Sequence, residues 1–99
     1  MPVCFQLYPK GAQEPEKLQI VDDKMREAFE QPSDPDNWLG GWYDSIGFRL
    51  AMGKTFEEIR TRFEAYIAEG NAVSYYTMAL ELLTWLEEHY TVDSWREMR

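Results

Sequence analysis

The strongest hydrophobic pattern in the chain runs from Val73 to Tyr90, a segment without glycine or proline. With residues placed every 100° around a helix axis, the polar side chains fall on one arc and the apolar ones cover roughly 220° of the circumference. The polar arc consists of Thr77, Glu81, Thr84 and Glu88. A helix on the surface of a globular domain needs an apolar stripe of only about 100°. The pattern therefore predicts a helix that is either central to the fold or shared with a partner.

A second helix is predicted just before this one, because Thr55 and Glu58 have the spacing of a capping box. In such a box the threonine side chain accepts a backbone N–H of the first turn, and the glutamate side chain reaches back to the threonine N–H. The helix carries a narrow apolar stripe of Phe56, Ile59, Phe63, Tyr66 and Ile67. Gly70 is predicted to end it, and Asn71 or Ser74 to cap the next helix. The short connection predicts two antiparallel neighbours.

The segment from Trp38 to Met52 predicts a third helix with one broad apolar face. That face consists of Trp38, Leu39, Trp42, Tyr43, Ile46 and Leu50. Gly40, Gly47 and Ala51 align on another side and predict a groove of small residues that a second helix can approach. Gly53 is predicted as the residue that closes this helix.

The N-terminal third predicts a β-hairpin and one short helix. Residues Val3 to Tyr8 alternate between apolar and polar positions, which is typical of a half-buried strand, and Lys17 to Ile20 are expected to return as a second strand. Asp22 is predicted to cap a helix whose buried stripe is Met25, Ala28 and Phe29. Residues 91–99 predict a frayed tail or a short final turn.

Together these elements predict a mainly α (α+β) fold in a single domain of residues 1–99. An N-terminal β-hairpin packs on a bundle of about four helices, with Val73–Tyr90 as the central helix. The length is that of one domain, and an apolar fraction of 44% is enough to form a core.

Composition limits the cellular compartment and the classes of binding partner that we expect. The formal net charge is −8, and the one net-positive stretch, residues 49–62, contains Arg49, Lys54, Arg60 and Arg62. Such acidity disfavours direct binding of nucleic acid or of an anionic membrane surface, and it leaves open a protein partner that is basic. The single cysteine, and the lack of a signal-peptide pattern or an apolar run long enough to span a membrane, predict a cytoplasmic protein.

The side chains available for chemistry are few. His89 is the one histidine and is expected on the surface, and Cys4 is expected to behave as a small apolar residue. No phosphate-binding loop, nucleophile motif or metal-ligand spacing occurs, since the sequence after Asp34 lacks the third oxygen ligand and the glycine of a calcium loop. We therefore expect neither a cofactor nor a metal, and no enzyme.

The function predicted from these features is a small, acidic, non-enzymatic protein–protein interaction module that acts as a regulatory, accessory or inhibitor protein. The candidate contact residues are Trp38, Trp42, Tyr43, Asp44, Tyr75, Met78, Trp85 and His89. Aromatic residues are enriched at the energetic centres of interfaces, although the pattern of Trp38–Met52 favours a core position for its aromatics. A homodimer is one form that such a module would take.

Two alternatives stay open at this point. One is an anionic inhibitor, of the kind that phages and mobile elements encode, which mimics DNA and blocks a nucleic-acid-binding host protein. The other is a small enzyme with a carboxylate-based site that uses Asp44 or His89 in an aromatic pocket.

Overall fold

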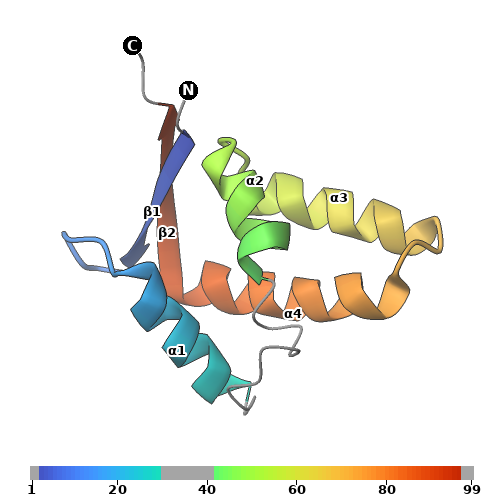
Figure 1. Ribbon diagram of the computed structural model, residues 1–99, viewed down its shortest axis with the longest axis horizontal. Coiled ribbons are helices and arrows are strands. Elements are labelled where there is room, and N and C mark those ends of the chain that lie inside the picture. The colour runs from blue at the N-terminus through green and yellow to red at the C-terminus, as the bar shows by residue number, and fades with distance from the viewer. Residues whose placement is uncertain (1–2, 30–41, 97–99) are drawn as a thin grey trace.

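The computed structural model describes residues 3–29 and 42–96, and the side chains of Val3, Trp95 and Arg96 are not among the described features. Within these ranges the chain forms four helices, one with a π-helical first turn, and a two-stranded sheet (Figure 1). The elements are β1 Val3–Pro9, α1 Leu18–Ala28, η2 Tyr43–Gly47, α2 Phe48–Ala51, α3 Phe56–Ala68, α4 Val73–His89 and β2 Tyr90–Arg96. The mainly helical α+β class is therefore confirmed. None of the helices in the described part has the length and hydropathy needed to cross a membrane.

The predicted N-terminal hairpin is wrong, because β1 pairs with a strand from the other end of the chain. β1 and β2 are antiparallel, with Val3 opposite Arg96 and Pro9 opposite Tyr90. The expected frayed tail is thus largely β2, which follows α4 directly. The residues that face the core from this ribbon are Phe5, Leu7, Val92 and Tyr90. The ribbon stands beside the helices and both described ends of the chain lie at its tip (Figure 1).

The segment that was expected to be the second hairpin strand begins α1 instead. Leu18, Val21 and Met25 are three and four residues apart, which is the spacing of a helical stripe, and both Val21 and Met25 are fully buried. Only an isolated bridge between Leu7 and Glu16 remains of the predicted pairing. α1 starts at Leu18 with Lys17 as its N-cap, so Asp22 lies inside the helix and does not cap it. Of the predicted stripe, Met25 is buried, Phe29 is half-buried and Ala28 is exposed.

The third predicted helix is present from Trp42 onward, and its expected start at Trp38 lies outside the described residues. Its first turn is wide, because Phe48 N–H bonds the carbonyl of Tyr43, five residues back. Gly47 is covered by the helix's own Tyr43, since a Cβ at Gly47 would lie 3.0 Å from the Tyr43 ring. The small-residue groove is therefore filled from within at Gly47. Gly53 ends the helix as predicted, with a φ of +86°.

The α3–α4 hairpin forms as the local sequence predicts. The Thr55 hydroxyl accepts Glu58 N–H, and the Glu58 carboxylate accepts Thr55 N–H, both at 3.1 Å, so the capping box is confirmed. Gly70 follows α3 with a φ of +79°. The predicted caps of α4 are wrong: Ala72 is the N-cap, held in the left-handed region by the tight connection (φ 44°), and no side chain caps the helix.

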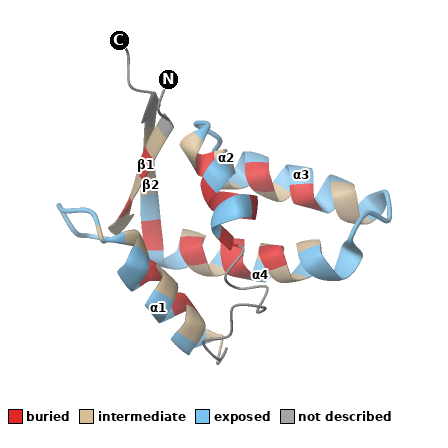
Figure 2. Ribbon diagram, in the orientation of Figure 1, coloured by how far each residue is buried: buried red, intermediate tan, exposed pale blue. Residues whose placement is uncertain are grey.

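α4 supplies a large share of the core, as its wide apolar arc predicts. Its buried residues are Ala79, Leu82, Leu83 and Leu86. Figure 2 shows burial along the body of α4 and exposure in its first turn. On the flank of the hairpin, Arg60 of α3 forms a two-pronged ion pair with Glu87 of α4, at 2.8 and 3.2 Å. This pair ties the first half of α3 to the end of α4.

Candidate functional site

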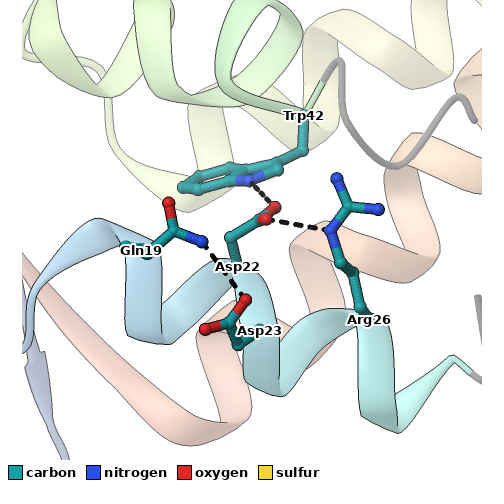
Figure 3. A network of polar contacts seen from close by, with 5 residues as sticks. All are labelled: Gln19, Asp22, Asp23, Arg26 and Trp42. Carbon is teal, nitrogen blue, oxygen red and sulfur yellow. Dashed lines mark hydrogen bonds and ion pairs between the residues drawn. The ribbon is translucent and has the colours of Figure 1, made fainter. Parts of the chain in front are cut away.

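Trp42, a predicted contact residue, is part of the interior and not of the surface. It is only 3% exposed, and its indole Nε1 donates to Asp22 Oδ1 of α1 at 3.0 Å (Figure 3). The other carboxylate oxygen of Asp22 accepts Arg26 Nε at 2.9 Å. Asp22 therefore joins the start of the η2–α2 helix to α1. Gln19 and Asp23 form a separate, exposed hydrogen bond beside this network.

Tyr43 and Asp44 are at the surface, next to the ribbon. Tyr43 is 47% exposed, and its ring lies over Gly47 with its centroid 6.0 Å from that of Phe5. Asp44 is exposed on the same turn. Trp38, the fourth candidate of this group, lies outside the described residues. Tyr43 thus shields the edge of the core at Phe5 while keeping about half of its own surface available.

The four candidates on α4 are spread along the helix. Tyr75 is exposed in the first turn, Met78 and Trp85 are half-buried, and His89 is exposed at the end. His89 stacks on Trp85 with 4.7 Å between ring centroids, and its Nδ1 lies 2.8 Å from the Trp85 carbonyl oxygen. At 1.5 Å per residue, Tyr75 and His89 are about 21 Å apart along the axis. The predicted residues therefore do not gather into one site.

The structure instead presents a groove between α2 and the first three turns of α3, with a volume of about 640 Å³. Phe48 and Met52 line its α2 side, and Ile59 and Ala65 lie on its α3 side. Phe48 is 59% exposed and Met52 is 49% exposed, the two highest values among the large apolar residues described. They are one helical turn apart, and the neighbouring Ile46 and Leu50 are fully buried, so the short helix has one apolar side toward the core and another toward solvent.

Charged side chains surround this apolar surface. Arg49, Lys54 and Arg62 line the groove together with Glu57 and Glu58. Glu58 is committed to the capping box, and its hydrogen bonds with Thr55 hold the pKa of its carboxyl below the ordinary value. Because Glu58 turns back to the helix start, the Glu58–Arg62 ion pair that their spacing favours is not formed in the described part of the chain.

Two of the cations have distinct positions. Arg49 Nη1 donates to the Ser45 carbonyl at 2.6 Å, and its guanidinium lies 5.1 Å from the Phe63 ring centroid, so Arg49 forms a fixed wall. The guanidinium of Arg62 lies 6.0 Å from the Tyr66 ring centroid of the same helix. Nearby, the pKa of Arg60 is raised, chiefly by its hydrogen bonds with Glu87.

A second polar cluster closes the base of the ribbon. Tyr90 is 3% exposed, and its hydroxyl donates to Glu16 Oε1 at 2.5 Å. Lys24 of α1 binds the other oxygen of Glu16 at 2.9 Å. The Tyr90 hydrogen bond lowers the pKa of Glu16, whereas burial, and then the carboxylate, raise the pKa of Tyr90. This cluster joins β2, α1 and the connection between β1 and α1, and its polar atoms bind one another, so we assign it to stability.

The described residues contain no group of three or more His, Cys, Asp or Glu side chains arranged to hold a metal ion. Asp44 and His89, the residues of the predicted carboxylate or histidine site, are both exposed, and neither lines the groove between α2 and α3. The groove can contact an apolar group and hold carboxylates at its edge. Comparison with protein-family models, with curated proteins and with solved structures finds no match for this chain.

Phe48 and Met52 were missed at the sequence level, although the sequence contains an indication of them. They lie four residues apart and off the face that Trp42, Ile46 and Leu50 share. Phe48 directly precedes the net-positive stretch 49–62, and Met52 lies within it. An apolar pair on the wrong side of a helix, followed by cations, is the pattern that predicts this groove.

Proposed function

We propose that this protein is a non-enzymatic interaction module that binds a helical segment of another protein in the groove between α2 and α3. The observation that carries the proposal is the exposure of Phe48 and Met52, at 59% and 49%, in a groove between two helices. Large side chains with this exposure that share one groove are a common feature of protein-binding surfaces.

The energy available from covering this pair supports a binding role. Burying a whole Phe or Met side chain stabilises by about 1.5–3 kcal/mol. Since each of the two is about half exposed, covering both contributes roughly 1.5–3 kcal/mol in total. A helix laid between α2 and α3 covers both residues at once, because they are one turn apart and point into the same groove.

The non-enzymatic part of the proposal rests on the residues at the groove. Its described lining includes neither His nor Cys, and Glu58 is engaged at the helix start. An enzyme built on Asp44 or His89 remains an alternative, but both side chains are exposed and neither faces this groove.

The alternative of an anionic, DNA-mimicking inhibitor rests on the net charge of −8 and has no specific feature of the fold to support it. Several carboxylates that would form such a surface are used internally. Asp22 binds Trp42 and Arg26, Glu16 binds Tyr90 and Lys24, and Glu87 binds Arg60. Binding through an anionic surface weakens steeply with added salt, whereas binding through apolar contacts in a groove does not depend on such weakening.

The test is a selection from a displayed library of random peptides of about 16 residues, a length at which a helix can form. The whole chain is the target. Selected peptides are then titrated, by fluorescence anisotropy, against the wild-type chain and three single variants: Phe48→Ala, Met52→Ala and Ile20→Ala. Ile20 is a matched control, because it is 43% exposed but lies on α1.

We expect Phe48→Ala and Met52→Ala each to weaken peptide binding about tenfold, the usual effect at the centre of an interface, and Ile20→Ala to leave it unchanged. A selection that yields no binder, or binders equally weakened by Ile20→Ala, would overturn the proposal. Light scattering of the chain alone is the companion measurement. A dimer that Phe48→Ala abolishes would assign the groove to a second copy and would also overturn it.

A further inference from the structure

The rim of the groove between α2 and α3 is positive, in a chain that is acidic as a whole. Arg49, Lys54 and Arg62 supply three positive charges, and Glu57 and Glu58 supply two negative ones. The groove lies on the stretch 49–62, where the chain's basic residues outnumber its acidic ones. The remainder of the sequence contributes the excess of negative charge.

Of the two carboxylates at the rim, Glu58 is engaged at the start of α3. Glu58 accepts the backbone N–H of Thr55 at 3.1 Å, as one half of the capping box. The charge of Glu57 acts on Arg60, whose pKa it helps to raise together with Glu87 and Glu64. The charge of Lys54 also helps to lower the pKa of Glu58, and three positive and two negative charges leave the rim with a net charge of +1.

Lys54 and Arg62 are the cations available to a ligand. Neither forms an ion pair within 4.0 Å with any carboxylate in residues 3–29 and 42–96. Arg62 lies against an aromatic ring of its own helix, which leaves its N–H donors free to bind a carboxylate. Arg49, by contrast, is held by Ser45 and Phe63.

The separation of these two cations defines a spacing for the ligand. Lys54 precedes Phe56, the first residue of α3, by two positions, and Arg62 is in the second turn of that helix. Six residues at 1.5 Å each place Arg62 about 9 Å beyond Phe56 along α3, and Lys54 lies two residues before that helix start. Two side chains seven residues apart on a bound helix are separated by about 10.5 Å, and those three and four residues on lie between them on the same face.

We infer that the segment bound in this groove is an acidic amphipathic helix, with two carboxylates about two turns apart that meet Lys54 and Arg62 and apolar anchors between them that cover Phe48 and Met52. This inference rests on the proposed function and specifies the chemistry of its partner. The overall charge of −8 does not oppose it at close range, because charges beyond about 8 Å are screened at physiological ionic strength.

The peptide selection tests this inference through the composition of its binders. We expect Phe48-dependent binders to carry Asp or Glu at two positions seven residues apart, with large apolar residues between. The double variant Lys54→Glu/Arg62→Glu should weaken their binding by roughly ten- to thirtyfold, since two attractions become two repulsions. A peptide with lysine at the same two positions should recover binding to this variant.

The control is the double variant Lys10→Glu/Lys17→Glu, which changes the net charge equally but alters exposed residues before α1. We expect it to weaken binding less than about threefold, through the general field alone. Phe48-dependent binders that are neutral or basic, or equal losses in the two double variants, would refute the acidic ligand and leave the proposed function standing. If no binder depends on Phe48, the proposed function itself fails.

Discussion

The hydrogen bond from Tyr90 to Glu16 makes a quantitative prediction about stability. In Tyr90→Phe the ring keeps its place, because it is 3% exposed and the substitution removes one oxygen. Glu16 then loses its 2.5 Å hydrogen bond but keeps Lys24 at 2.9 Å. Hydrogen bonds to charged groups contribute about 1.5–3 kcal/mol, and the remaining partner places this loss near the lower end, at about 1.5–2 kcal/mol.

Chemical denaturation at pH 7 measures this loss, and the midpoint of thermal unfolding should fall by roughly 10 °C for a domain of this size. Tyr8→Phe is the control. The Tyr8 hydroxyl donates to neutral Gln6 at 3.1 Å in a half-exposed position, so its removal should cost about 0.5–1 kcal/mol. Equal losses in the two variants would refute the special role of the charged partner.

The same bond makes the stability difference between wild type and Tyr90→Phe depend on pH. The pKa of Glu16 is lowered in the folded state, so its contribution is complete above the ordinary value of 4.5 and is lost as the pH falls through the folded pKa. The pKa of Tyr90 is raised, so its contribution is complete below pH 10 and is lost at higher pH. The difference should therefore be largest between about pH 5 and pH 10 and shrink on both sides. A difference that is constant from pH 3 to pH 11 would contradict this linkage.

Three further substitutions test other contacts by the same denaturation measurement. Asp22→Ala leaves the buried Trp42 N–H without its acceptor and should destabilise the fold by about 1–3 kcal/mol. Asp23→Ala removes only an exposed hydrogen bond to Gln19 and should be close to neutral, so similar effects of the two variants would refute the Asp22 bridge. Thr55→Ala removes the N-cap of α3 and should lower the free energy of unfolding by about 1 kcal/mol. Thr55→Ser should retain most of the stability, and an equal loss of stability in the two variants would argue against a capping role. Asp93→Pro should destabilise the fold by about 3 kcal/mol or more, because the backbone of Asp93 pairs with Gln6. Asp93→Ala should have little effect, because the side chain is exposed, and a proline variant as stable as the alanine variant would refute the β1–β2 ladder.

What could be predicted from the sequence depended on how local the determining interactions are. The capping box of Thr55 and Glu58 and the glycines that end two helices are each complete within a few residues, and the structure confirms them. The wide apolar arc of α4 likewise indicated its burial. Each of these depends on the chain's own neighbours and needs no knowledge of the rest of the fold.

The strand pairing was wrong because short apolar segments are ambiguous. Residues 17–20 fit a strand as well as the first turn of a helix, and Val21 and Met25, which resolve the choice, continue a helical spacing. The alternation of Tyr90, Val92 and Ser94 with Thr91 and Asp93 has the period of a strand, but its partner lies at the other end of the chain. Local preferences do not identify a partner at that distance.

The predicted contact residues and the groove between α2 and α3 differ for a related reason. Trp42 was expected to mark an interface because tryptophan is common there, yet its N–H meets Asp22 in the interior. Phe48 was not among the predicted contact residues, yet it is more than half exposed. Residue type alone does not decide between core and interface, because both use the same aromatic side chains. The packing of α1 and of the β1–β2 ribbon determines which of these aromatic residues are buried.

The pairing of β1 with β2 has a consequence for the order in which this protein acquires its structure. Val3 and Arg96 are at opposite ends of the described chain, so the sheet joins segments that are as remote in sequence as the fold permits. During synthesis β1 emerges first and has no partner until residues 90–96 follow, whereas the α3–α4 hairpin can form from neighbouring residues as soon as both helices exist. Throughout that interval Phe5 and Leu7 lack the strand that later lies beside them, and a nascent chain stalled before Tyr90 should be open to proteases.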